Sequence, residues 1–475
     1  MSPYGRTPAA RDCPAALNEV EVGAAPIDRY EPLLDHDVWL EFDRSMRDLA
    51  ERLRGRRVWN VNSTAQGGGV AELLASLIPY DRGVGIDEHW LTIEGSQAFF
   101  NVTKRIHTLL HGVASDGSEI TNEERREYER TMERNASALA DIVASGDVVI
   151  LHDPQSAGLV PALRLHGAHV IWRSHVGVDE PNDIVRAAWS LLRPYLDPAD
   201  AFVFSRPSYA WEGLDPKRVH IIPPCIDAFA TKNRELGKTE VDEILSASGI
   251  IASSNGGATG VIAHRAEMTG PALPSDAQIV LQVSRWDRLK DPVGVLEAFT
   301  RHVAPATGSF LVLAGPAATS VRDDPEQPEV LAELASRQKE LPEATGRRVR
   351  IAQLPMEDED ENALMVNALQ RRGDVVVQKS LAEGFGLTVA EAMWKSRPVV
   401  ASRVGGIEDQ IEDGKSGLLT GPQDLDQFGK AVVDLLLDRD EAMRLGDAAR
   451  ERVAHHFLGP RHLMQQGQLI QALIE

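Results

Sequence analysis

The sequence lacks most features of secreted, membrane and nucleic-acid-binding proteins. Its 475 residues include two cysteines, Cys13 and Cys225, so a disulfide framework is excluded. No apolar run approaches the roughly 18 residues of a membrane span, and the polar first residues lack the hydrophobic core of a secretory signal. The net charge of −21 argues against nucleic acid or an anionic membrane as a partner. We therefore expect a cytoplasmic protein that binds neither.

Several common cofactor and metal motifs are also missing. The chain has no G-x-G-x-x-G fingerprint and no His/Cys cluster with zinc spacing. The letters Gly414-Lys415-Ser416 do not complete a P-loop, because Asp409 stands where that loop needs its first glycine. The segment Asp438-Arg439-Asp440 matches the D-x-D pattern of some metal–nucleotide sites, but it joins two predicted helices, and we interpret it as a charged linker. We expect no metal site and no tightly bound cofactor.

The order of predicted elements indicates an α/β protein with two doubly wound domains. A chain of 475 residues is too long for one core, and strands alternate with helices in two successive blocks, as in parallel sheets with right-handed crossovers. Pro223-Pro224 marks a hinge between the blocks. The predicted parts are an N-terminal extension of uncertain order (1–30), an N-terminal domain (31–223), a C-terminal domain (224–440) with a mobile insertion at about 250–275, and C-terminal helices (441–475).

The stretch from Leu381 to Met393 predicts an anion-binding turn. It follows the apolar run 374–378, which is typical of a buried parallel strand, and precedes a helix. Free N–H groups at a helix start bind anions, and the glycine turn 384–386 leaves the approach open. Glu383 and Glu391 frame this turn, and carboxylates accept hydrogen bonds from hydroxyl groups rather than binding phosphate. The site therefore suits a phosphate joined to sugars.

Other candidate residues also follow predicted strands, where ligands of such sheets bind. Arg285 and Lys290 come after the first strand of the second domain, and both residue types bind phosphate. The triplet Gly67-Gly68-Gly69 lies between a strand and a helix, although a tight turn explains it equally well.

Two histidines occupy the same kind of position in the first domain. His152, with Asp153 after it, ends one predicted strand, and His175 follows the next. A histidine just past a strand is often a satisfied structural residue, so both a structural and a functional interpretation stay open.

Glu383 and Glu391, with seven residues between them, resemble the E-x7-E motif of retaining GT-B glycosyltransferases of the GT4 type. Six further segments resemble the trehalose glycosyltransferring synthases, and with the E-x7-E run the resemblance covers about residues 56–440. These segments are 62–64, 67–72, 99–104, 152–155, 283–287 and 323–326. Two parts depart from the pattern, the insertion at 250–275 and the segment Phe204–Ser208.

The resemblance implies a fold and an activity. The fold is GT-B, with two Rossmann-like domains facing each other across a cleft, the first on the acceptor side and the second binding the nucleotide sugar. The activity is reversible transfer of glucose from UDP-, ADP- or GDP-glucose to glucose, with retention, giving trehalose. Fungal-type trehalose phosphorylases are relatives, so phosphorolysis or transfer to another small acceptor is an alternative. A catalytically silent sugar-nucleotide sensor is an alternative of another class.

The resemblance also implies which residues act. The implied catalytic set is His175, Arg285, Lys290 and Glu383. The implied donor-binding set is Gly68, Gly69, Arg285, Lys290, Glu383, Gly386, Leu387, Thr388 and Glu391. The implied acceptor-binding set is Asn101, Lys104, His152 and Asp153. The sequence offers no convincing nucleophile, which favours front-face attack. Mg²⁺ would at most stimulate modestly, and the nucleobase, the direction in the cell and the oligomeric state, a homodimer among the options, are left open.

Overall fold

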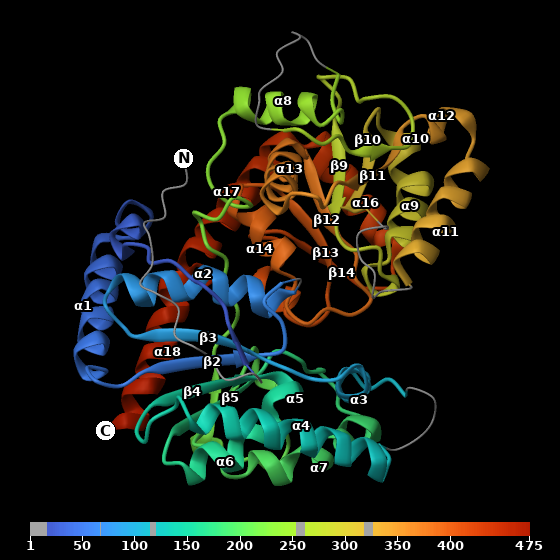
Figure 1. The fold of residues 1–475 in the computed structure, drawn as a ribbon. Coiled ribbons are helices and arrows are strands. Elements are labelled where there is room, and N and C mark those ends of the chain that lie inside the picture. The colour runs from blue at the N-terminus through green and yellow to red at the C-terminus, as the bar shows by residue number, and fades with distance from the viewer. Residues whose placement is uncertain (1–16, 67, 115–119, 253–261, 318–325) are drawn as a thin grey trace. The chain divides into compact units, whose positions relative to one another are not determined.

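The computed structural model describes residues 17–66, 68–114, 120–252, 262–317 and 326–475. The chain forms two compact α/β units. Unit 1 consists of Met1–Cys225 and Leu458–Glu475, and unit 2 of Ile226–Phe457 (Figure 1). The C-terminal helices expected over 441–475 are therefore divided, because α17 (Arg439–His456) belongs to unit 2 and α18 (Gly459–Ile474) to unit 1.

Unit 1 contains a seven-stranded sheet in the order β1-β3-β2-β4-β5-β6-β7. Its strands are β1 (Leu17–Glu19), β2 (Val58–Asn62), β3 (Glu88–Ile93), β4 (Val148–His152), β5 (His169–Ser174), β6 (Ala201–Phe204) and β7 (Val219–Ile221). All pairs are parallel except β1 with β3. The chain passes from β2 to β3 and then returns to β4 on the other side of β2. The carboxyl ends of β2 and β4 therefore form a topological switch point, where such sheets bind ligands.

Helices cover both faces of this sheet. They are α1 (His36–Arg52), α2 (Gly69–Gly83), α3 (Gln97–Leu110), α4 (Asn122–Ala140), α5 (Asp153–Ser156), α6 (Val160–Leu165), α7 (Asp183–Leu196) and α18. Helices α1, α2 and α18 lie on one face, and α3, α4, α6 and α7 on the other (Figure 1). Apolar strand residues such as Val61, Leu151 and Trp172 are fully buried beneath the second group.

Residues 1–30 are expected to form an N-terminal extension of uncertain order, and this expectation is wrong for residues 17–30, which are part of unit 1. Leu17 begins strand β1, which pairs with β3 along the edge of the sheet. Tyr30 is fully buried and its ring lies 5.0 Å from that of Tyr80. Distant residues supply these contacts, so the local periodicity of the segment gave no sign of them. Residues 1–16 lie outside the described residues.

Unit 2 contains a second seven-stranded sheet in the order β14-β13-β12-β9-β10-β11-β8. Its strands are β8 (Glu267–Met268), β9 (Ile279–Val283), β10 (Phe310–Pro316), β11 (Val349–Leu354), β12 (Val375–Gln378), β13 (Val399–Ser402) and β14 (Leu418–Thr420). Only the edge pair β8–β11 is antiparallel among these strands. The chain passes from β9 to β10 and β11 and then returns to β12 beside β9, which makes a second switch point.

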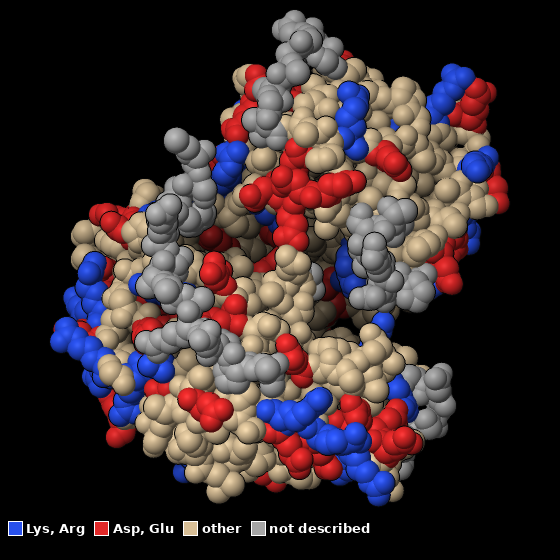
Figure 2. Space-filling model, viewed as in Figure 1, with Lys and Arg blue, Asp and Glu red and all other residues tan. Residues whose placement is uncertain are grey.

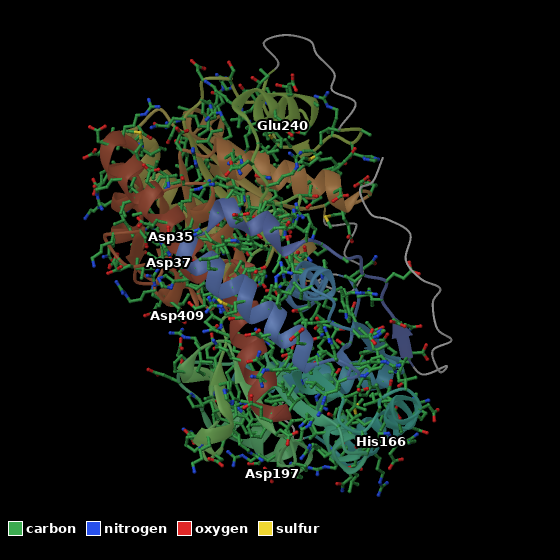
Figure 3. All side chains as sticks on the ribbon, turned by 90° about the vertical axis from the view of Figure 1, so that its left-hand side faces the viewer. Asp35, Asp37, His166, Asp197, Glu240 and Asp409 are labelled. Carbon is green, nitrogen blue, oxygen red and sulfur yellow. The ribbon has the colours of Figure 1, made fainter. Side chains whose placement is uncertain are left out.

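Helices surround this sheet as well. They are α8 (Lys238–Ala247), α9 (Pro292–Ala298), α10 (Ala304–Ala306), α11 (Glu326–Glu340), α12 (Glu343–Gly346), α13 (Glu359–Arg372), α14 (Leu387–Trp394), α15 (Ile407–Gln410), α16 (Leu425–Leu437) and α17. Asp409, labelled in Figure 3, belongs to α15. The segment Gly414-Lys415-Ser416 is a turn that follows this helix, so it is not a phosphate loop between strand and helix.

The insertion expected at about 250–275 is partly built into the sheet. Residues 253–261 lie outside the described residues, but β8 pairs with β11, and Ile251 forms a bridge with Leu273. The Arg350 Nε–H also donates to the Pro271 carbonyl (2.8 Å). The described second half of the insertion is therefore tied to the sheet by strand pairing and by this hydrogen bond, and its mobility stays a prediction.

The surface agrees with the acidic composition. On the face shown in Figure 2, acidic and basic side chains are interspersed among uncharged ones, without a broad basic field among the residues drawn. Within the described ranges, no helix is both long and apolar enough to cross a membrane.

Candidate active site

Two predicted residues of unit 2 meet at the switch point between β9 and β12. Lys290 ends a short turn after β9, and Glu383 lies in the loop after β12. The Lys290 Nζ donates to the Glu383 Oε2 (2.5 Å), and their side chains are only 18% and 10% exposed. The two loops are also joined by a backbone bond from Leu381 N–H to the Leu289 carbonyl (2.7 Å). A partly buried cation and a partly buried carboxylate thus lie together at the ligand edge of the sheet.

The glycine turn before α14 has the geometry that the sequence predicts. Gly386 has a φ of +85°, and a Cβ on it would lie 3.1 Å from both the Glu383 Cγ and the Ile407 Cγ1. No side chain of the described residues caps α14. The N–H groups of Leu387 and Thr388, in its first turn, are therefore available to an anion.

Arg285 follows β9 on the same loop. Its side chain is 59% exposed, and its guanidinium pairs with Asp287 (3.1 Å). The neighbouring Trp286 is buried and donates from Nε1 to the Pro316 carbonyl (2.7 Å), which anchors the loop. Arg285 is thus an exposed cation on an anchored loop.

Glu391 lies one turn into α14 and is buried. Lys232 Nζ lies 3.7 Å from its Oε1, and Gln370 Nε2 lies 3.5 Å from its Oε2. The buried Lys395 donates to the Gln370 Oε1 (2.8 Å), the Asn233 Oδ1 (3.1 Å) and the Glu391 backbone carbonyl (3.0 Å). Burial lowers the pKa of Lys395 to about 7, and the negative charge of Glu391 opposes this shift.

A second buried lysine supports the Lys290 turn. Lys379 directly follows β12, and its ammonium donates to the Asp291 carboxylate and to the Pro422 carbonyl (3.0 Å). Asp291 also accepts from the Gly294 N–H (2.9 Å) and caps α9. These contacts hold Asp291, the residue after Lys290, in place. Lys379 is not among the site residues predicted above, although a lysine that directly continues an apolar strand can be recognised in the sequence.

In unit 1, the structure brings His152 and His175 together. His152 Nδ1 and His175 Nε2 lie 3.0 Å apart, and the two rings are stacked with centroids 5.3 Å apart. Burial, and then the nearby Arg173 charge, lower the pKa of His152 to about 3 and that of His175 well below its ordinary value. Both rings are therefore neutral at neutral pH and can exchange hydrogen bonds with hydroxyl groups.

Asp153 contacts the same pair. Its Oδ1 accepts the His175 backbone N–H (2.8 Å), and its own backbone is left-handed with a φ of +62°. Burial raises the pKa of Asp153 to about 7, against the opposing effects of that hydrogen bond and of Arg173. Asp153 thus fixes the backbone of His175.

The remaining predicted residues of unit 1 lie at its surface. Gly68 has a φ of +148° and precedes Gly69, the exposed first residue of α2, while Gly67 lies outside the described residues. Asn101 and Lys104 are exposed on α3. Asn101 accepts a hydrogen bond from Gln97 (3.0 Å), and in the described part of the chain no hydrogen bond or ion pair joins Asn101 or Lys104 to the histidines.

Arg173 is another residue of this site that is not among the predicted ones. It is buried within β5 and donates to the His462 Nε2 (2.8 Å) and the Ile222 carbonyl (3.1 Å). The His462 Nδ1 contacts the Pro223 carbonyl (3.0 Å), which can only accept, so His462 carries its proton on Nδ1. An arginine inside an apolar strand can be recognised in the sequence, and it indicates a buried charge with a specific partner.

The chain matches two known families over most of its length. Residues 60–211 match the family described as trehalose synthase, N-terminal domain, and residues 263–452 match glycosyl transferases group 1. A trehalose synthase of Rubrobacter xylanophilus is 35% identical over 466 residues, which is 96% of this chain and 99% of that relative. The chain belongs to the trehalose synthase family.

More distant relatives agree with this assignment. A trehalose phosphorylase of Pleurotus sajor-caju is 27% identical over 86% of this chain and 57% of its own length. An E. coli structure described as trehalose-6-phosphate bound with UDP-2-fluoro glucose has a TM-score of 0.66 at 14% identity, covering 88% of this chain and 99% of that one. The predicted family and the predicted GT-B α/β fold are confirmed. The chain is a glycosyltransferase related to trehalose synthesis.

Proposed function

We propose that this protein transfers glucose from a nucleoside diphosphate glucose to glucose, with retention, and so forms α,α-trehalose reversibly. The observation that carries this proposal is the Lys290–Glu383 pair (2.5 Å) beside the uncapped start of α14. A cation, a carboxylate and helix N–H groups together match a diphosphate joined to a sugar. The UDP-2-fluoro glucose in the E. coli structure supports such a donor.

Each group of unit 2 has a role in donor binding in this proposal. Lys290 and Arg285 neutralise the diphosphate, and the N–H groups at the start of α14 complete the cradle. Glu383 accepts hydrogen bonds from hydroxyls of the donor glucose, and Glu391 accepts those of the ribose. Lys290 also contacts Glu383, so the bound diphosphate would share this ammonium with the carboxylate.

The proposed chemistry follows from where charge develops. The bond between the donor anomeric carbon and the phosphate oxygen breaks, and a bond to the acceptor oxygen forms on the same face. The acceptor proton passes to the departing phosphate oxygen. Negative charge grows on the diphosphate, where the fixed cations stabilise it.

The unit 1 residues complete the proposal. Neutral His175 contacts the donor sugar at the reacting centre, and His152, Asp153, Asn101 and Lys104 serve the acceptor. The approach of Gly68 and Gly69 to the donor phosphates, metal independence, a homodimer and a cytoplasmic location remain predictions.

One assay tests the proposed donor. The purified protein is incubated with trehalose and UDP, ADP, GDP or inorganic phosphate, and the activated glucose is identified by mass spectrometry. Formation of a nucleoside diphosphate glucose supports the proposal and names the base. Glucose phosphate formed only with inorganic phosphate would identify a phosphorylase. Binding of a nucleotide sugar without any turnover would identify a sensor.

A further inference from the structure

A continuous line of polar side chains leads from the buried edge of unit 1 to His175. Asp81, in α2, forms a side-chain hydrogen bond with Glu88 at the start of β3. The Asn60 Nδ2 donates to the Glu88 Oε1 (2.6 Å), and the Asn60 Oδ1 faces the His152 Nε2 (3.1 Å). His152 then contacts His175 (3.0 Å). The first four of these residues are buried, whereas the His175 residue is partly exposed.

The chemistry of the partners fixes the direction of each bond. An ionised carboxylate only accepts, so the nitrogen of the Asn60 amide must face Glu88 and its oxygen must face His152. That oxygen also only accepts, so His152 carries a proton on Nε2. A neutral His152 then has a lone pair on Nδ1, which accepts from the His175 Nε2–H. The remaining nitrogen of His175, its Nδ1, is left as an acceptor.

The two carboxyl groups at the start of the line, those of Asp81 and Glu88, share a single proton. Burial, and then the negative charge of Glu88, raise the pKa of Asp81 well above its ordinary value. Asp81 therefore keeps its proton and donates it to Glu88. Burial also raises the pKa of Glu88, but the hydrogen bonds from Asp81 and Asn60 oppose this shift, so Glu88 is the ionised member of the pair. Two buried like charges are avoided, and one charge remains to orient Asn60.

We propose that Glu88 and Asn60 are positioning residues that hold His152 and His175 as Nε2–H tautomers, so that the His175 Nδ1 is presented as a hydrogen-bond acceptor for a substrate hydroxyl. The substrate in this statement rests on the proposed function, whereas the tautomers do not. The line acts through His152, because His152 is the residue of the line that contacts both Asn60 (3.1 Å) and His175 (3.0 Å).

The cost of the arrangement argues against a purely structural role. Burying carboxyl groups within a sheet is unfavourable, and apolar residues of similar size often stabilise such positions better. Trp90, two residues after Glu88 on the same face, is a large buried side chain, and its Nε1 donates to the Asn62 Oδ1 (2.8 Å). The polar line therefore carries a cost in stability, and it leads to a candidate catalytic histidine.

Neutron diffraction from deuterated crystals of the full-length wild-type protein tests the proton positions directly. We expect deuterium on Nε2 of His152, on Nε2 of His175 and on the Asp81 carboxyl, and none on Nδ1 of either histidine. Deuterium on the His175 Nδ1, or on both nitrogens of either ring, would overturn the proposal. This result does not depend on which reaction the protein catalyses.

Two variants test the consequence for turnover. Asn60→Leu keeps a similar size but breaks the line, and we expect kcat to fall about 10–100-fold, by analogy with residues that orient metal-bound histidines. Nucleotide affinity, measured by calorimetry, should stay unchanged, because Asn60 is not among the proposed nucleotide contacts. In the matched Asp81→Asn variant the amide can donate the same bond to Glu88, and kcat should stay within about 2-fold of the wild type by this reasoning. Wild-type kcat in Asn60→Leu, or an equal loss in both variants, would contradict the positioning role.

Discussion

Lys290 and Glu383, whose Nζ and Oε2 lie 2.5 Å apart, come from loops after β9 and β12. Their contact depends on the strand order of unit 2. Strands β10 and β11 separate β9 from β12 in the sequence, yet β12 pairs directly with β9. The crossover at this point brings the carboxyl ends of the two strands together, and the predictions for the donor site follow from this geometry.

Replacing Lys290 with alanine should lower turnover far more than thermal stability. The ammonium faces the proposed departing diphosphate, and loss of one such stabilising donor typically costs about 10²–10³ in rate. Steady-state kinetics and thermal melting of the purified variant provide the two measurements. Arg288→Ala is the matched control, because Arg288 lies in the same turn but is itself exposed and pairs with the partly exposed Glu333 (3.1 Å). Turnover of Lys290→Ala close to that of the wild type would rule out the cradle.

Substitution of Gly386 by alanine should lower both stability and activity. A left-handed residue with a Cβ costs about 1–2 kcal/mol, and this Cβ would also press on the Glu383 side chain at 3.1 Å. Gly414→Ala is the control variant, because Gly414 has a similar φ of +75° but open space around it. Denaturant unfolding should show a loss in both variants, at least as large for Gly386→Ala, whereas only Gly386→Ala should lose turnover. Equal activities in the two variants would contradict the role of the turn.

The Glu391→Gln variant should bind the nucleotide more weakly than the wild type. Hydrogen bonds to a charged group contribute about 1.5–3 kcal/mol, so we expect the Kd for nucleoside diphosphate to rise about tenfold or more. Glucose affinity should stay the same. Calorimetry measures both, with Glu441→Gln on the exposed face of α17 as the control. Unchanged nucleotide affinity would exclude the ribose contact.

The stability of Asp153→Asn should depend less on pH than that of the wild type. In the folded protein the pKa of Asp153 rises from 3.8 to about 7, so this proton stabilises the fold fully below pH 3.8 and its contribution is lost as the pH rises through about 7. Asparagine keeps the acceptor for the His175 N–H and does not titrate. The free energy of unfolding should therefore favour the variant progressively from pH 4 to pH 8, by about 1–3 kcal/mol given the partial exposure of the residue. A constant difference between the two proteins across this range would show that Asp153 titrates normally.

Activity should persist in excess EDTA, and an α-configured donor should give an α-linked product. Lys290, Arg285 and the start of α14 already supply positive charge to the donor phosphates. A metal-stripped assay tests the first part, and the anomeric coupling in the proton NMR spectrum of the product tests the second. Loss of all activity that only a divalent metal restores would contradict the cationic cradle. A β-linked product would contradict retention.

The sequence by itself determined the local units of this protein and the family to which it belongs. Alternating apolar strands and amphipathic helices predicted two doubly wound sheets, because side-chain periodicity is a local property. Glu383, Glu391 and the glycine turn between them were readable for the same reason. Lys290 and the histidines were found because each follows a recognisable strand, the position where such sheets bind ligands.

Only the tertiary structure decided which of these residues meet. The Lys290–Glu383 pair, the partners of Lys395 and the line from Asp81 to His175 depend on strand order and on hydrogen bonds between distant segments. The edge strand β1 depends on pairing with β3 in the same way. The packing of the whole unit determines such contacts, because it places residues of different strands side by side. The local sequence around one of these residues does not specify its partner.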